Sequence, residues 1–146
     1  MALIRIASVA RTVRIPLLSD PACVGVIEAE ADLFRETLDP GVLKSIRLDD
    51  VTHATIRALT PLQLAEARMR GIQGAKDPRT HGLHATLAVV EAGLVSIDGF
   101  KDFEDLRAHC GDLFNVTMEL GARIDTVSTL GESGASPCAP LSGEAT

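Results

Sequence analysis

The side chains best suited to chemistry in this chain are its histidines, and their spacing gives little support for a reactive site. His81 and His84 are three residues apart and can share one turn of a helix. A metal site would need further ligands, and the candidates are Asp77, His109 and Cys110. Zinc sites show tighter ligand spacing than this. The alternative is that His81 and His84 lie in a loop or at the start of a helix.

The cysteines are equally poor candidates for catalysis. His109 and Cys110 are adjacent, and adjacent residues on a helix do not face each other, so they make an unfavourable catalytic couple. Cys110 is better explained as a small buried apolar residue. The other two cysteines, Cys23 and Cys138, are far away in sequence, and no Cys-x-x-Cys pair occurs. We therefore expect a reducing compartment and no disulfide scaffold.

Two further segments resemble ligand sites only superficially. Four acidic residues gather around a turn, where they could bind a cation: Asp98, Asp102, Glu104 and Asp105. The spacing of a calcium-binding loop is absent, and a helix start attracts acidic residues by itself. Residues 71–76 (GIQGAK) follow a helix and lack the Gly-Lys-Ser/Thr ending of a phosphate loop. The sequence thus predicts a non-enzymatic protein with no cofactor and no metal.

Composition narrows the range of partners. The chain has 146 residues, of which 46% are hydrophobic and 23% charged, values typical of one globular domain. It has no Trp or Tyr and four Phe, which disfavours base stacking, and its net charge of −6 disfavours binding to nucleic acid. The first apolar run is interrupted by Arg5, and no stretch is long and apolar enough to span a membrane. We expect a protein that is not secreted and binds neither nucleic acid nor membrane.

The best-specified element that could position these groups is a helix start. Thr60 can accept a hydrogen bond as the N-cap, and Pro61 suits the first helical position, where its missing N–H costs nothing. Leu62, Ala65 and Met69 follow at helical spacing. This junction divides an extended front half from a helical back half.

The front half predicts strands and one ambiguous segment. Apolar patterns favour strands within residues 3–15, 23–27, 42–48 and 51–59. Residues 28–38 favour a helix by composition, with Leu33, Phe34 and Leu38 on one face.

The back half predicts helices. The first covers residues 62–70 and is loosened at its end by Gly71 and Gly74. The second follows the stripe Leu83, Leu87, Val90 and Leu94. A third covers residues 103–110 with Asp102 as N-cap, and Gly111 separates it from the last. The last carries the stripe Leu113, Val116, Leu120, Ile124 and Val127.

The resulting prediction is one α+β domain over residues 1–130. A small, mostly antiparallel sheet from the N-terminal half is packed by three or four helices from the C-terminal half. Residues 131–146 are rich in Gly, Ser and Pro and are expected to be a tail that is flexible or ordered by a partner. Pro137, Pro140 and Leu141 are its candidate partner-binding residues, and the alternative is an unstructured end.

Three segments carry a family resemblance: residues 59–67 (LTPLQLAEA), 92–100 (AGLVSIDGF) and 119–124 (ELGARI). Their order resembles small accessory proteins encoded among the structural genes of tailed bacteriophages and prophages, including tail-assembly proteins. The resemblance covers residues 50–130, while the tail departs from the more charged ends of such proteins. It implies a virion structural or assembly protein with no catalytic residues, located in the virion or the host cytoplasm. Its partners would be other structural proteins of the same assembly, and it would be an oligomer or an assembly subunit.

A second interpretation remains open beside the resemblance. The chain can also be a small cytoplasmic ligand-binding or regulatory domain that uses the region of His81, His84 and His109. A metal-dependent enzyme is the third possibility.

Overall fold

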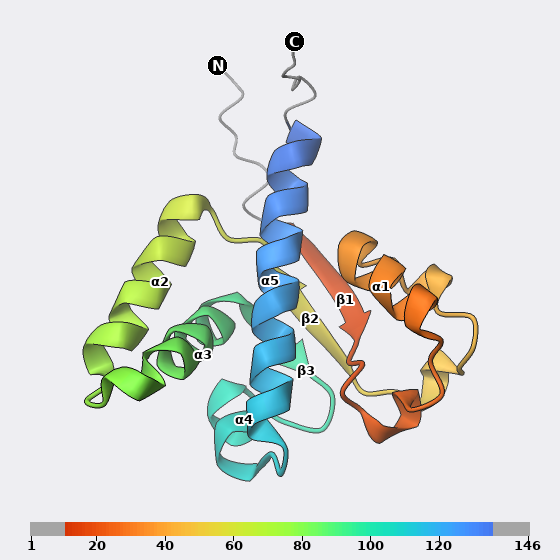
Figure 1. The fold of residues 1–146 in the computed structure, drawn as a ribbon, viewed down its shortest axis with the longest axis horizontal. Helices are drawn as coiled ribbons and strands as arrows, with labels where there is room; N and C mark the ends of the chain where they lie inside the picture. The colour runs from red at the N-terminus through yellow and green to blue at the C-terminus, as the bar shows by residue number, and fades with distance from the viewer. Residues whose placement is uncertain (1–10, 136–146) are drawn as a thin grey trace.

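A computed structural model describes residues 11–135, which form an α+β fold (Figure 1). Three antiparallel strands pair in the order β1-β2-β3. The strands are β1 (Thr12–Pro16), β2 (His53–Arg57) and β3 (Leu94–Ile97). The helices are α1 (Glu28–Thr37), α2 (Pro61–Gly74), α3 (His81–Gly93), α4 (Phe103–His109) and α5 (Leu113–Ala135). The predicted fold class is therefore confirmed.

The core lies between the sheet and α5, the central helix in Figure 1. β2 alternates as a half-buried strand should, with Ala54 and Ile56 buried. From α5, the predicted stripe places Leu120, Ile124 and Val127 in the core without any exposed surface. Burying one such side chain contributes about 1.5–3 kcal/mol, so these three residues contribute substantially to stability.

Two predicted strands in the front half are wrong. Residues 23–27 follow a 3-10 turn, Pro21–Cys23, that is fixed when the Asp20 carboxylate accepts the Ala22 N–H. Residues 42–48 follow a second 3-10 turn, Pro40–Val42. In both segments, local turn chemistry overrides a pattern of apolar residues that otherwise favours a strand.

The second of these segments is held by α1 and not by a sheet. The Glu30 carboxylate accepts the backbone N–H groups of Lys44 and Ser45 and the Ser45 hydroxyl, at 3.1, 3.0 and 2.6 Å. Those N–H groups are consequently not free for a strand ladder. The ambiguous segment 28–38 resolves as α1, and of its expected apolar face Phe34 and Leu38 are buried while Leu33 is exposed.

The helix start at Thr60 is confirmed. The Thr60 hydroxyl accepts the Gln63 N–H, and the Gln63 side chain accepts the Thr60 N–H in return, which completes a capping box. The sequence predicted that the helix loosens at Gly71. In the structure it continues to Gly74. Gly71 lies so close to the His84 carbonyl of α3 that a Cβ would collide with it.

The third strand comes from the back half, which the sequence analysis did not foresee. α3 ends at Gly93 and the chain continues directly into β3, which pairs with β2 and is followed by a turn at Gly99 with φ of 90°. The predicted helix after Asp102 is present, and the Asp102 carboxylate accepts the Asp105 N–H.

The last helix is present too, and α5 extends to Ala135, past the expected domain boundary at residue 130. Pro137, Pro140 and Leu141 lie outside the described residues. Within residues 11–135, no helix is long and apolar enough to cross a membrane.

Candidate functional site

The three candidate histidines lie on helices and are not gathered into one site. His81 is the first residue of α3 and His84 lies one turn later, which matches the helix-start alternative. His109 is on α4, where its Nδ1 lies 2.9 Å from the Asp105 carboxylate. In the part of the chain that the structure describes, no three His, Cys, Asp or Glu residues gather as metal ligands.

Three of the four acidic residues around the turn at Gly99 (Asp98, Asp102 and Asp105) accept a backbone N–H. Asp98 accepts the His53 N–H at 3.1 Å, and Asp102 caps α4. Asp105 accepts the Lys101 N–H at 2.8 Å, and this bond, with that of His109, keeps its pKa below the ordinary value. These carboxylates therefore organise the turn, as a helix start requires.

Among residues 11–135, Cys23 and Cys110 do not form a nucleophilic site with histidine. Cys23 is buried, and desolvation raises the pKa of its thiol to about 11. Cys110 ends α4 and lines a mostly apolar cavity of about 240 Å³ together with Phe100, Leu106 and Val116. That volume is below the range usual for ligand sites. Within residues 11–135, His109 makes no hydrogen bond to Cys110.

A larger and more polar cavity, of about 440 Å³, opens between α2, α3 and α4. Its polar lining includes Arg70, His84, Glu91 and Arg107. Two of these four groups are the guanidinium groups of Arg70 and Arg107, which makes the cavity a candidate site for an anionic small molecule.

An exposed apolar surface belongs to α2, which packs against α3 by its small residues. Ala67 is the one residue of this helix that is fully enclosed, and Gly71 allows the two backbones to approach closely. On the opposite side, Leu62 and Met69 are seven residues apart and lie on one line along the helix. They are 66% and 54% exposed. The apolar stripe seen in the sequence is thus the outer face of α2.

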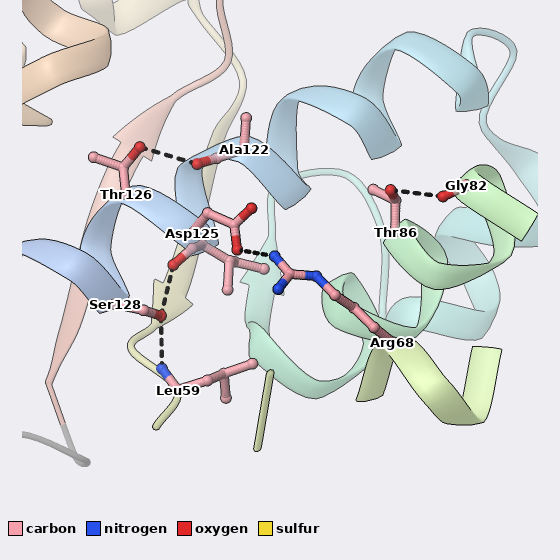
Figure 2. A network of polar contacts seen from close by, with 9 residues as sticks. Leu59, Arg68, Gly82, Thr86, Ala122, Asp125, Thr126 and Ser128 are labelled. Atoms are coloured by element: carbon pink, nitrogen blue, oxygen red, sulfur yellow. Dashed lines mark hydrogen bonds and ion pairs between the residues drawn. The ribbon is translucent and has the colours of Figure 1, made fainter. Parts of the chain in front are cut away.

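A polar network joins the inner side of α2 to α5 (Figure 2). Arg68 reaches across to Asp125 at 2.6 Å. Beside it, the Ser128 hydroxyl accepts the buried Leu59 N–H at 2.9 Å and donates to the Ile124 carbonyl at 2.7 Å. The ion pair links α2 to α5, and the Ser128 bond holds the backbone just before the helix start.

Hollows flank this network on both sides. One of about 180 Å³ is lined by residues that include Thr86, Val89 and Met118. The other, of about 220 Å³, is lined by Pro61, Leu64 and other residues, and Arg68 borders both. The side of the molecule between α2 and α5 is therefore grooved as well as partly apolar.

Compared with protein-family models, curated proteins and solved structures, the chain gives no match. The geometry described above is accordingly the basis for any functional conclusion.

The outer residues of α2 are functional candidates that the sequence reasoning missed. Leu62, Ala65 and Met69 were recognised as a helical stripe, but a stripe of this kind normally faces the core. The available signal was Ala67 and Gly71 on the opposite side, since small residues at helical spacing permit close helix packing. The candidate docking residues Pro137, Pro140 and Leu141 cannot be compared with this face, because they lie outside the described residues.

Proposed function

We propose that this protein is a non-enzymatic protein–protein interaction component, of the kind that serves as a virion structural or assembly protein in tailed bacteriophages. One observation carries the proposal: the outer face of α2, defined by Leu62, Ala65 and Met69, exposes two large apolar side chains, with the exposed Glu66 between them. Exposed apolar patches on soluble proteins mark sites of interaction. The resemblance of residues 50–130 to phage accessory proteins supports the choice of class.

The expected mechanism is burial of surface between subunits. A specific interface buries about 1,600 Å² in total, and a few central side chains carry most of its energy. Leu62 and Met69 are suited to that central role, because they are the large side chains of the face. Arg68 and Arg70 flank them on the two sides of the helix and can contribute to a polar rim.

The test is co-expression with the products of the neighbouring genes, followed by affinity purification and light scattering. We expect those genes to encode portal, capsid or tail proteins, and one product to form a complex of fixed stoichiometry. Met69→Glu should weaken that complex roughly tenfold or more. Ala108→Glu, the same charge change on an exposed residue of α4, should leave it intact. Genes of unrelated function, or a complex indifferent to Met69→Glu, would contradict the proposal.

The tail supplies a separate test. We propose that Pro137, Pro140 and Leu141 contribute to partner binding, as a short docking segment. Deletion of residues 136–146 begins after the end of α5 and should leave the unfolding free energy unchanged while weakening the complex. If deletion leaves the affinity unchanged, these residues have no part in binding. If it unfolds the domain, the tail belongs to the core.

A second candidate function is a small ligand-binding or regulatory domain, which the cavity between α2, α3 and α4 favours. Arg70, His84 and Arg107 would recognise an anionic ligand there. Inorganic phosphate and small carboxylates are the probes, with amide chemical shifts as the readout. Saturable shifts around His84 that disappear in Arg107→Ala would support this function, and the absence of any shift at millimolar probe would exclude it.

A further inference from the structure

The charges of the molecule are separated along its longest axis. α2 and the start of α3 lie at one end of that axis and α1 lies at the other (Figure 1). Residues 61–84 contain four Lys and Arg against two Asp and Glu, a net charge of +2, together with His81 and His84. Residues 28–50 contain seven Asp and Glu against three Lys and Arg, a net charge of −4. A chain with a net charge of −6 thus has one basic end.

In the described part of the chain, ion pairs neutralise some of these charged side chains and leave others unpaired. At the basic end, Arg68 pairs with Asp125 and Arg79 pairs with Asp77. At the acidic end, Arg35 pairs with Glu28 and Asp32 of its own helix. Within residues 11–135, the ion pairs involve neither Arg70 and Lys76 at the basic end nor Glu36 at the acidic end, which leaves these three side chains free to meet a partner's charges.

Both ends also carry exposed apolar side chains. The basic end has the outer face of α2, with Leu62 and Met69. At the acidic end, Leu33 is 47% exposed on α1, and Glu36 lies three residues on, at the spacing that makes helical residues neighbours. Ile27, at the N-terminal end of the same helix, is 55% exposed. Each end therefore combines exposed apolar side chains with a net charge of one sign over its residues, although Glu66 lies between Leu62 and Met69 on α2.

We propose that copies of this chain associate head to tail, with the outer face of α2 of one copy against the outer face of α1 of the next. Leu62 and Met69 pack on Leu33, and the basic residues around α2 meet the acidic residues around α1. The occupant of the α2 face is thus a second copy of the chain. This rests on the proposed interaction function and names its partner.

The arrangement has a definite consequence for symmetry. The two contacting surfaces differ, so the interface is heterologous, and each copy keeps one unused surface for another copy. Such contacts produce a closed ring when the rotation between copies closes, and an open chain when it does not. A two-fold dimer through α2 alone would instead bring two basic ends together.

The test uses two variants, each of which blocks one end. Met69→Glu places an acidic group on the α2 face, and Leu33→Lys places a basic group on the α1 face. Both residues are exposed, so the fold tolerates the changes, which circular dichroism checks. Ala108→Glu and Ala108→Lys are the matched controls on α4. Sedimentation velocity of the full chain over a range of concentrations gives the size of the species.

We expect the unmodified chain and both controls to form species larger than a dimer, and each blocked variant to stay monomeric. Equal amounts of the two blocked variants should combine into a dimer and go no further, because the mixture retains one intact α2 face and one intact α1 face. Association of the unmodified chain should weaken roughly tenfold from about 50 mM to about 500 mM NaCl, since salt screens exposed charges.

Several results would overturn the inference. They are a monomeric unmodified chain at all concentrations, a dimer that persists in Leu33→Lys, failure of the mixed variants to combine, or association unaffected by salt. The proposed function fails separately. If the unmodified chain is monomeric but Met69→Glu still breaks the complex with a neighbouring gene product, then α2 binds a different protein, and only the self-association is wrong.

Discussion

α5 and α2 use their apolar side chains in opposite ways. α5 turns Leu120, Ile124 and Val127 onto the sheet and buries them completely. α2 turns its small residues inward and leaves Leu62 and Met69 exposed. An apolar stripe in one helix therefore marks stability, whereas in the other it marks a surface available for contact.

The reason for the difference is the closeness of the α2–α3 packing. Gly71 lies directly against the backbone of α3 at His84, and no larger side chain would fit between the two helices. Leu62 and Met69 are left on the far side of α2, while Leu64 packs against the core. The comparison predicts that mutations in the two helices separate stability from association.

The largest difference in unfolding free energy is expected between two Leu→Ala substitutions, one on α5 and one on α2. Leu120→Ala should lower the free energy of unfolding by about 2–5 kcal/mol, because it leaves a cavity in the core. Leu62→Ala should change it by less than about 0.5 kcal/mol, because Leu62 is exposed. Urea denaturation measures both. Comparable losses in the two variants would mean that Leu62 contributes to the core.

The next comparison is between Gly→Ala substitutions at two glycines of α2. Gly71→Ala should destabilise the domain by about 1–3 kcal/mol, because its Cβ meets the His84 carbonyl and forces the helices apart. Gly74→Ala meets nothing within 4 Å and should stabilise the domain by about 0.5–1 kcal/mol, since alanine favours a helix. Thermal unfolding checks the opposite signs. A neutral Gly71→Ala would show that the α2–α3 contact is loose.

The next prediction concerns the capping box at Thr60, and it tests how much the cap contributes to the unfolding free energy. Thr60→Ala removes the acceptor for the Gln63 N–H and should cost about 1 kcal/mol of unfolding free energy. Thr129→Ala, at an exposed position of α5, serves as the control and should cost less than about 0.5 kcal/mol. Equal effects in urea denaturation would show that the box adds nothing to the stability of α2.

The smallest expected change in unfolding free energy is that of Asp20→Asn, and it depends on pH. Hydrogen bonds from the Ala22 backbone and from Thr52 hold the pKa of Asp20 below its ordinary value of 3.8. A carboxyl with a lowered folded-state pKa stabilises the fold above its unfolded pKa, and this contribution is lost as the pH falls through the folded-state value. Asp20→Asn should therefore cost about 1 kcal/mol at pH 7.

The cost of Asp20→Asn should shrink as the pH falls from about 5 towards 2, because the protonated Asp20 then resembles the amide. Urea denaturation at several pH values measures the difference between the two proteins. A difference that stays constant over this range would mean that the Asp20 charge does not stabilise the loop.

Periodic and capped segments were predictable from the sequence, because their signals are local. Thr60 and Asp102 are side chains that cap a helix by themselves, and the stripe of α5 extends over five apolar residues. The α+β class follows from these elements and from β2. The extent of α2 was misjudged, because Gly71 is favourable for close packing although it is unfavourable for an isolated helix.

Features that depend on distant residues were not predictable. The supposed strand at residues 42–48 is displaced by Glu30, which lies on another element and takes up its backbone donors. β3 is too short to give a periodic signal and forms because β2 offers it a partner. The outward orientation of Leu62 and Met69 depends on where α3 packs, which the sequence of α2 does not contain.

The most direct test of the central claim is a paired measurement on the double variant Leu62→Glu/Met69→Glu. Sedimentation velocity reports association, and urea denaturation reports the unfolding free energy. We expect that association is lost while the unfolding free energy stays within about 0.5 kcal/mol of that of the unmodified chain. A variant that unfolds, or one that associates as the unmodified chain does, would contradict the assignment of the outer face of α2 as the contact surface.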